Sequence, residues 1–491
     1  MENHDYEKII DVIIAFNNEK RYDKLLDIIL EKMMDLTCSD AGTLYVVEDD
    51  HLHFRILKNK TLNVFKTVED MIDLPPIKLD KNNIDNVSAY VAINNEIIEV
   101  DDVYTSEKFN FSGPKKYDEL TGYKTRSMLV LPLSVYQDNE TEVFGVMQLL
   151  NATNRETGEI VPYVNTYNPP LVPALANIAA ATLANITYVK DVNTLIQSFV
   201  VTMAQAIDER SKYNSNHTLK VTELCKAFTR YLNQSLPEDH PYYFDDRQIE
   251  EFSMAASLHD IGKITTPVRI MDKAFRLGDK LTPVKYRFEI KRHQLEIDML
   301  KGEITKEERD EQIKALDKAE ELIASIIYIP ILSDEQISEI KKLKDYTYRD
   351  ANNKNIPILD SDDIEDLSIK KGTLTAHERT IMQDHALITN KLVNNMTFSK
   401  YYKNVPLWAG NHHELLDGTG YPNGIKDIPL EVCILTIVDI FEALTAADRP
   451  YKSATSIDSA LEILANMAEH GKLHRDLVQL FKESEAWKGI I

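Results

Sequence analysis

The sequence predicts a multidomain protein with an N-terminal α+β domain, a long linking helix and a C-terminal all-α domain that carries a helical insertion. The length of 491 residues predicts two to four folded units, at roughly 150 residues per domain. Strand-like segments gather within residues 43–150, whereas residues 200–491 hold almost no alternating apolar runs. With 43% hydrophobic residues and only 15 Gly and 18 Pro, the chain can form buried cores.

The N-terminal part predicts an antiparallel sheet with flanking helices. We expect a helix over residues 1–40, because apolar residues recur there at near-helical spacing from Leu25 to Met33. Two strands around the acidic turn 48–50 should pair as a hairpin, and two more should flank the polar turn 137–142. These four strands are residues 43–47, 52–57, 127–133 and 143–150. Helix, antiparallel sheet and helix again form an α+β plan typical of sensor domains.

Residues 171–210 predict one long helix that links the two halves. Five apolar residues in it step by three, four, three and four, which is coiled-coil spacing: Val189, Val192, Ile196, Phe199 and Met203. This stripe fits either packing on the helix's own domain or parallel homodimerisation, and both interpretations stay open. The uncharged stretch 160–189 is long enough to cross a bilayer, but its four prolines and four asparagines argue against a membrane span.

Charge and cysteine content narrow the class of protein. The chain has 56 Lys and Arg residues against 79 Asp and Glu residues, a net charge of −23, which argues against a surface that coats a nucleic-acid polymer. Three scattered cysteines do not form a disulfide framework and fit a reducing compartment. The first residues lack the pattern of a secretory signal, so we expect a cytoplasmic protein.

Residues 284–371 interrupt the helical C-terminal part with a segment rich in Lys and Glu. We interpret this segment as an insertion that forms a solvated helical hairpin, with an acidic loop at residues 360–368.

Histidines next to carboxylates mark the candidate chemistry. His259 and Asp260 follow an apolar helix, and the pair His412 and His413 precedes a Gly- and Pro-stiffened loop, with His217 before and His385 between. Gly262 provides a break beside the first pair. A zinc finger would need cysteines at short spacing, and the sequence has none. Mixed imidazole and carboxylate ligands suit divalent iron, manganese or zinc, and two such ions a few ångströms apart suit phosphoester hydrolysis.

The N-terminal part resembles a GAF domain over about residues 20–185. The resemblance depends on the order of elements and on segments 126–133 and 144–152, which look like its two central strands. It implies a module for a small ligand or a protein and names neither. His51 and His53 on the hairpin are interpreted as polar surface residues.

The C-terminal part resembles the HD-GYP phosphohydrolases over about residues 200–490. The motifs at 259–263, 412–422 and 439–452 occur in the family's order. The resemblance implies an all-helical fold and two divalent metal ions, Fe or Mn, with Asp260 as the bridging ligand. The implied metal ligands are His217, His259, Asp260, His385, His412, His413, Asp439 and Glu442.

Glu442 matters for a third ion, which some members of that family bind. Those members also carry a Glu four residues before the first His, where this chain has Tyr213. We therefore expect two ions and leave a third open. Glu414 and Asp417 are either further ligands or partners that orient the imidazoles, and we favour the second interpretation.

The same resemblance implies the residues that act on substrate. Asp260 and Lys263 are the expected catalytic residues, with Lys263 contacting the phosphate or the attacking water. Tyr421, Arg449 and Lys452 are expected to contact the substrate together with Lys263, although the spacing to Arg449 is one residue longer than usual.

These inferences predict three regions: a GAF-like domain at 1–185, a linking helix at 186–210 and an HD-GYP domain at 211–491. The predicted function is a regulated phosphodiesterase that converts cyclic di-GMP to pGpG or on to GMP. Cyclic GMP-AMP is the alternative substrate. Another nucleotide phosphoester, or a catalytically silent signalling protein, is the alternative function.

Overall fold

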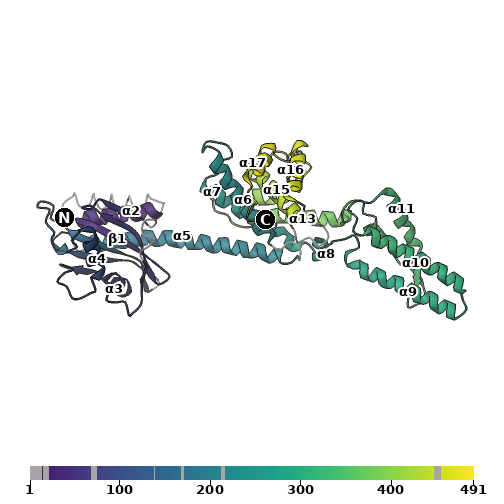
Figure 1. Cartoon of the computed structure of the whole chain (residues 1–491), viewed down its shortest axis with the longest axis horizontal. Coiled ribbons are helices and arrows are strands. Elements are labelled where there is room, and N and C mark those ends of the chain that lie inside the picture. The colour runs from purple at the N-terminus through teal and green to yellow at the C-terminus, as the bar shows by residue number, and fades with distance from the viewer. Residues whose placement is uncertain are drawn as a thin grey trace. The chain divides into compact units, whose positions relative to one another are not determined.

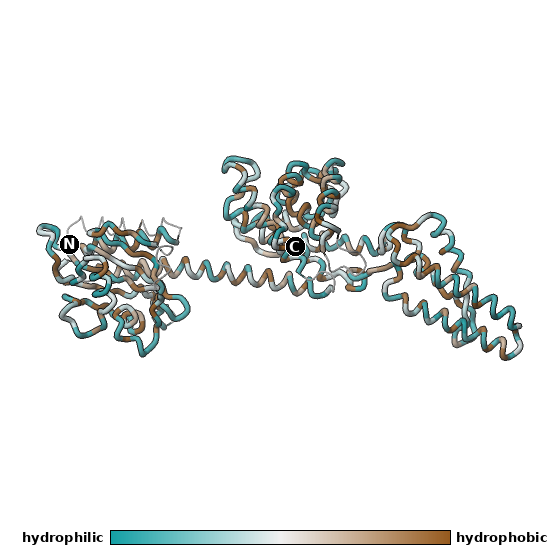
Figure 2. Tube along the Cα trace, in the orientation of Figure 1, coloured by the Kyte–Doolittle hydropathy of each residue, from teal (hydrophilic) through white to brown (hydrophobic). Residues whose placement is uncertain are grey.

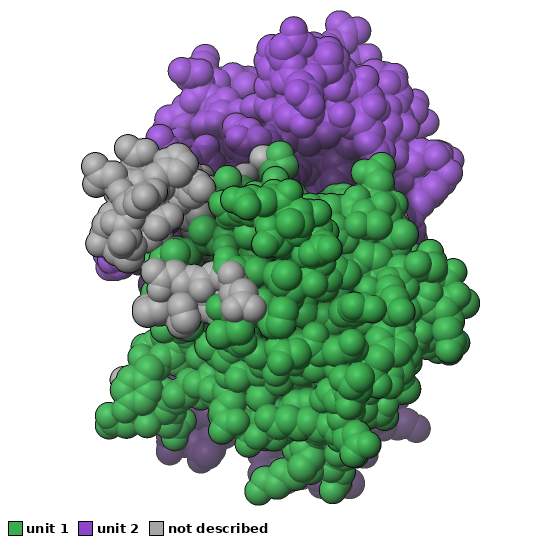
Figure 3. All heavy atoms as spheres, turned by 90° about the vertical axis from the view of Figure 1, so that its left-hand side faces the viewer, with its two compact units in different colours: residues 1–194 green, residues 195–491 purple. Residues whose placement is uncertain are grey.

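The computed structural model describes residues 14, 22–67, 75–137, 139–166, 171–211, 216–446 and 455–491. The chain divides into two compact units, residues 1–194 and 195–491 (Figures 1 and 3).

The first unit is built on an antiparallel sheet with strand order β3-β2-β1-β7-β6-β5, and β4 pairs with β2. This confirms the predicted antiparallel sheet. The turn between β1 and β2 consists of Asp49 and Asp50, both at positive φ. The strands are β1 (Ser39–Glu48), β2 (His51–Asn59), β3 (Val64–Lys66), β4 (Ile77–Lys78), β5 (Ile98–Val100), β6 (Met128–Gln137) and β7 (Glu140–Ala152).

Alternating side chains give this sheet two apolar faces. Leu44 and Val46 pack into one core with α2 (Tyr22–Leu36) and the first part of α5 (Leu171–Asp208). Tyr45 points to the other face, where α3 (Val87–Asn94) and the segment before α4 (Ser112–Thr121) close a second core. The period of two along a strand therefore places helices on both faces.

The predicted helix over residues 1–40 is too long at its C-terminal end. Residues 1–13 and 15–21 lie outside the described residues, α2 ends at Leu36, and β1 begins at Ser39. The Thr37 hydroxyl donates to the Met33 carbonyl at 2.8 Å, and Cys38 takes a positive φ of 54°. This left-handed residue turns the chain out of the helix and into the sheet.

Most of the uncharged stretch 160–189 lies in helix α5. This helix is the one candidate span by length and composition among the described residues. Leu175, Ala179 and Leu183 of its first part are fully buried against the sheet of the first unit. Further along, brown positions alternate with polar ones (Figure 2), and the exposed apolar residues there are Val189, Val192, Leu195, Ile196 and Phe199.

The second unit contains a helical core that is closed by residues far apart in sequence. Apolar faces of α6, α7, α14, α15, α16 and α17 form most of this core, and Val200 of α5 and Val393 of α13 also belong to it. The elements are α6 (His217–Ser235), α7 (Asp246–Leu258), η3 (Ile261–Thr265), α8 (Val268–Met271), α13 (Ala376–Asn394), α14 (Val405–Gly410), α15 (Leu430–Thr445), α16 (Ile457–Glu469) and α17 (Arg475–Ser484).

The segment between α8 and α13 forms a substructure with a hydrophobic core of its own. Its hairpin of α9 and α10 confirms the predicted helical pair. The predicted acidic loop is wrong, because residues 361–367 form a helix in which Asp363 and Asp366 are buried. The elements are α9 (Leu281–Leu300), α10 (Lys306–Ile326), α11 (Asp334–Lys342), α12 (Ser361–Leu367) and the short strands β8 (Thr347–Arg349) and β9 (Asn355–Pro357).

Candidate metal centre

Seven of the predicted metal ligands meet in the helical core of the second unit, although up to 222 positions separate them in the sequence. His217 is the first residue of α6, and His259 and Asp260 lie between the end of α7 and η3. His385 lies on α13, His412 and His413 follow α14, and Asp439 lies on α15. All except the half-buried His413 are buried.

The ligand atoms form two groups, each within 4.8 Å. One group is His217, His259 and Asp260, and the other is His385, His412 and His413. Asp260 lies between them, since its Oδ2 is 3.3 Å from His259 Nε2 and its Oδ1 is 3.3 Å from His385 Nε2.

Asp439 also faces both groups. Its Oδ1 lies 3.2 Å from His217 Nε2, and its Oδ2 lies 3.7 Å from His413 Nδ1. Two carboxylates therefore separate two sets of imidazoles, as a two-ion site requires.

Backbone carbonyls fix the tautomer of three of these histidines. The Nδ1 atoms of His259, His385 and His412 lie 2.6 to 2.7 Å from the carbonyls of the residues three positions earlier. A carbonyl only accepts, so each Nδ1 carries a proton and each Nε2 is the atom that faces the centre. Metal-ligating histidines are typically oriented by such partners.

The centre is short of donors in a way that a cation would satisfy. The Nε2 atoms of His385 and His412 face each other at 3.3 Å, and neither can donate in this tautomer. His259 Nε2 and Asp260 Oδ1 are buried without a hydrogen-bond partner. Because buried acceptors without partners are costly, these residues fit bound cations.

Electrostatics keep most of the cluster in the ligand form. Burial lowers the pKa of His412, and the neighbouring imidazoles lower it further. Burial likewise lowers the pKa of His413 to about 3. Burial alone would raise the pKa of Asp260, but Lys263 and the adjacent imidazoles hold it well below its ordinary value. The carboxylate is therefore ionised while His412 and His413 are neutral.

His259 and His217 behave differently. Burial alone would lower the pKa of His259, but the carboxylates of Asp260 and Asp439 raise it above its ordinary value. Burial alone would also lower the pKa of His217, but hydrogen bonds to Asp260, Asp439 and Glu442 raise it well above its ordinary value. Glu442 lies on the outer side of this ring, with Oε2 at 2.5 Å from His217 Nδ1, and it belongs to neither ligand group. The structure brings Glu442 to a predicted ligand, and its part in a third ion stays a prediction.

Of the four residues predicted to contact the substrate, Lys263 and Tyr421 lie within the described residues. Lys263 Nζ contacts Asp260 Oδ2 from the edge of the cluster. The Tyr421 ring packs on His413 at a centroid distance of 4.6 Å, and its backbone N–H donates to the His413 carbonyl at 3.1 Å. Arg449, Lys452 and Tyr213 lie outside the described residues.

The prediction for Glu414 is wrong. Its buried carboxylate accepts hydrogen bonds from the backbone N–H groups of residues 423, 424 and 425, at 2.6 to 3.1 Å. It therefore organises the loop after Tyr421 and does not orient an imidazole. The prediction for Asp417 is wrong as well. Its carboxylate accepts a hydrogen bond from the Thr419 hydroxyl at 2.7 Å and so belongs to the same loop.

Sequence reasoning missed the reason for Gly262. A Cβ at this position would lie 2.0 Å from the His385 carbonyl oxygen and 2.6 Å from Thr389 N. The Thr389 hydroxyl accepts from Gly262 N at 3.0 Å and donates to the His259 carbonyl at 2.8 Å. Glycine is required because the turn after Asp260 packs directly on the backbone of α13.

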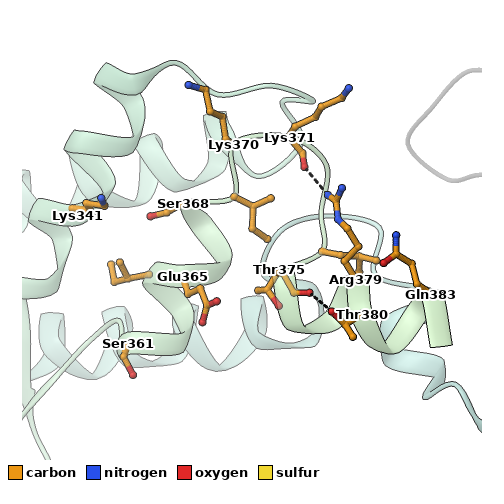
Figure 4. A pocket seen from close by; sticks show the side chains of 14 residues that line it. Lys341, Ser361, Glu365, Ser368, Lys370, Lys371, Thr375, Arg379, Thr380 and Gln383 are labelled. Carbon is orange, nitrogen blue, oxygen red and sulfur yellow. Dashed lines mark hydrogen bonds between the residues drawn. The ribbon is translucent and has the colours of Figure 1, made fainter. Parts of the chain in front are cut away.

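Two other features lie apart from this centre. His51 and His53 are half-buried on β2, and neither belongs to a metal-ligand group among the described residues. A groove of about 750 Å³ lies between α12 and the start of α13 and contains none of the predicted ligands. Figure 4 shows Lys341, Lys370 and Arg379 around this groove.

Comparison with known proteins matches each unit to a domain family. A sequence model of the GAF domain family matches residues 21–183, and one of the HD domain family matches residues 362–477. The chain combines a GAF domain with an HD domain. The HD match begins in α12, the last helix of the insertion, and so does not include His217, His259 or Asp260. This domain makeup is typical of soluble signalling proteins.

Curated relatives of the chain carry names of cyclic-dinucleotide phosphodiesterases. The "3'3'-cGAMP-specific phosphodiesterase 3" of Vibrio cholerae is 42% identical over 97 residues, which are 19% of this chain and 20% of the relative. The "Cyclic di-GMP phosphodiesterase response regulator RpfG" of Xanthomonas campestris is 39% identical over 107 residues, 21% and 27% of the two chains. These matches span about a quarter of each relative or less.

A longer match joins both domains. The "3'3'-cGAMP-specific phosphodiesterase 2" of Vibrio cholerae is 24% identical over 405 residues, which are 77% of this chain and 72% of the relative.

Proposed function

We propose that the protein is a metal-dependent phosphodiesterase that hydrolyses a cyclic dinucleotide. The observation that carries this proposal is the arrangement of ligand atoms: two groups of imidazoles face each other across Asp260, with the Nε2 atoms of His259 and His385 turned toward its carboxylate. In this proposal His217, His259, Asp260 and Asp439 hold one divalent ion. The second ion is held by Asp260 with His385, His412 and His413.

Two such ions, iron or manganese, would supply Lewis-acid activation of water and neutralise charge on the phosphate. The protein's own residues would bind and position the substrate. Lys263 keeps its positive charge because Asp260 raises its pKa against the lowering effect of burial. Its amine could therefore meet a phosphate oxygen at the edge of the cluster, and the ring of Tyr421 offers an apolar face beside His413.

Cyclic di-GMP is the first candidate substrate and pGpG, or GMP after a second cut, is the expected product. Cyclic GMP-AMP is the second candidate, because the relative matched over 405 residues is named for that specificity. The predicted contacts of Arg449 and Lys452 belong to the same proposal.

Product analysis by chromatography tests the proposal. Protein reconstituted anaerobically with Fe(II) or Mn(II) is incubated with each dinucleotide, and linear product is expected from the wild type. Asp260→Asn keeps the side-chain volume and should abolish turnover, whereas His470→Ala, at an exposed histidine on the surface, should not. Absence of product from folded, metal-loaded protein would favour another nucleotide phosphoester or a silent signalling protein.

We propose that a small ligand at the GAF domain regulates this activity. A cavity of about 520 Å³ lies between the sheet, α3 and α4 and is lined by aromatic rings such as Tyr45, Phe54 and Phe111. In it the Tyr45 hydroxyl donates to Gln148 Oε1 at 3.0 Å. Mass spectrometry of compounds released from purified protein tests this, and Gln148→Leu should lower their amount.

We propose further that the protein is a cytoplasmic homodimer joined through α5. The supporting observation is the exposed apolar stripe at coiled-coil spacing, in which Val189, Val192 and Phe199 are 61%, 53% and 63% exposed. Light scattering after size-exclusion chromatography should give a dimer mass. Phe199→Glu should reduce it to a monomer, whereas Gln197→Glu, at an exposed polar site on the same helix, should not.

A further inference from the structure

Arg210, two residues after the C-terminal end of α5, makes hydrogen bonds to the turn that carries the candidate catalytic lysine. Arg210 Nη1 donates to the carbonyl of Lys263 at 2.8 Å and also to that of Ile264, and Nη2 donates to the carbonyl of Thr266 at 3.3 Å. These carbonyls belong to η3 and the residue after it, directly behind His259 and Asp260. One guanidinium therefore bonds to three carbonyls in the second half of this turn.

The same end of α5 holds the helix that begins with His217. The buried carboxylate of Asp208 accepts from Thr218 N at 2.9 Å and from the Thr218 hydroxyl at 3.1 Å. Thr218 is the second residue of α6, and Asn216, the N-cap residue, provides no side-chain cap. Asp208 thus satisfies an N–H that a helix N-terminus leaves without an intrahelical partner, and its charge suits the helix dipole.

A third bond completes the attachment. Ser211 Oγ lies 2.5 Å from Asp272 Oδ1, and Asp272 ends the short helix α8 that follows η3. The last residue of α5 and the three residues after it, 208–211, are therefore bonded to the elements on both sides of the first ligand group.

We infer that Asp208 and Arg210 are positioning residues that couple α5 to the metal centre. This inference rests on the proposed function and names the regulation of that same site. Asp208 sets the start of α6 and with it His217, while Arg210 sets the turn that holds Asp260 and Lys263. Since the first part of α5 is buried in the core of the GAF unit, a change in that core has a continuous helix to act on.

A small displacement would be enough to change the activity. Ligand atoms in the first group lie within 4.8 Å of one another, so a shift of α6 against η3 changes their spacing directly. Misplacement by about 1 Å can cost on the order of 100-fold in rate. The geometry therefore links the position of the α5 end to the occupancy and the rate of the metal centre.

The test compares full-length variants without relying on turnover alone. Arg210→Gln removes the guanidinium, Arg210→Lys keeps its charge, and Arg230→Gln changes an exposed arginine on α6 as the matched control. We expect Arg210→Gln to lower Mn(II) affinity by about tenfold in equilibrium dialysis, with partial recovery in Arg210→Lys. Hydrogen exchange should rise at residues 261–266, and kcat should fall while KM changes little.

Mn(II) binding and hydrogen exchange are measured without substrate, so they separate this inference from the proposed function. If the wild type hydrolyses no cyclic dinucleotide, the proposed function fails and the positioning role is still measured. Mn(II) affinity and exchange at 261–266 equal to those of the wild type in folded Arg210→Gln would overturn the positioning role.

A second variant tests the coupling. Gln197→Pro interrupts α5 at an exposed position ahead of the attached end. Introduced alone, Gln197→Pro should change the Mn(II) affinity of the protein. Combined with Arg210→Gln, it should cause no change in affinity beyond that of Arg210→Gln alone. Additive losses would mean that the helix reaches the centre by another route, and the coupling would be rejected.

Discussion

The Nε2 atoms of His385 and His412 face each other at 3.3 Å, and both rings already use Nδ1 to donate to a backbone carbonyl. Two lone pairs at this distance repel each other unless a cation lies between them. Each ring is held by its own helix or helix end, so neither can turn away without losing its carbonyl partner. The fold therefore maintains a donor-poor centre that binding of an ion would stabilise.

Metal binding should raise the stability of the HD domain. At an ion concentration of 100 times the Kd, binding to the folded state alone adds about 2.7 kcal/mol. We expect Mn(II) to raise the thermal midpoint of the wild type and a chelator to reverse the rise. His385→Ala should show a smaller rise, and His470→Ala should match the wild type. Equal responses in His385→Ala and wild type would contradict the assignment.

Ion binding should also release a proton from His217. The raised pKa of His217 means that the metal-free protein holds this proton near neutral pH, whereas a ligand Nε2 must be deprotonated. Affinity should therefore rise with pH, by about tenfold per unit, until the pH passes that pKa. Below it, protons and ions compete for the same ring.

Calorimetry at pH 7 in two buffers of different ionisation enthalpy measures this release. The apparent binding enthalpy of Mn(II) should differ between buffers by an amount equivalent to at least one proton, because the pKa of His259 is raised as well as that of His217. His412 and His413 should contribute none, because their pKa values are lowered. In Glu442→Gln one of the hydrogen bonds that raise the pKa of His217 is weakened, so fewer protons should be released. The same enthalpy in both buffers for the wild type would count against the prediction.

The sequence could predict those parts of the site that local motifs encode. His259 with Asp260, and His412 with His413, are adjacent in the chain, and their contexts indicate helix ends. The role of Glu414 could not be predicted, because its partners are backbone N–H groups 9 to 11 positions later, whose direction depends on the folded loop.

In the insertion, too, contacts between residues far apart in the sequence could not be predicted. Residues 360–368 look like an acidic loop, but Asp363 and Asp366 are buried because Arg287 and Lys273 contact them from 76 and 93 positions away. No local pattern encodes such pairs. Charge density predicted exposure here, and tertiary pairing overrode it.

The buried cation of Lys273 should hold the insertion to the HD domain. Its Nζ lies 2.7 Å from Asp366 Oδ1 and 2.7 Å from Glu378 Oε2, and its side chain is almost fully buried. Lys273→Met would leave these carboxylates with less compensation, and breaking a buried pair costs about 3 kcal/mol or more. Hydrogen exchange in α12 and the first turn of α13 should rise accordingly.

Lys370→Met is the matched control for this change. Lys370 pairs with Asp334 at 2.8 Å, but both side chains are largely exposed, so solvent screens the pair and exchange should change little. If the two variants gave equal exchange, burial of the Lys273 pair would have no special role.

Gly262→Ala should weaken the metal centre through the backbone of α13. The added Cβ would lie 2.0 Å from the His385 carbonyl oxygen, a main-chain atom that cannot rotate away, so the turn and the helix must separate. That separation moves Asp260 away from His385, and Mn(II) affinity should fall by about 10- to 100-fold. Gly113→Ala, where a Cβ meets nothing within 4 Å, should bind Mn(II) like the wild type. Wild-type affinity in Gly262→Ala would mean that the ligands do not depend on this close contact.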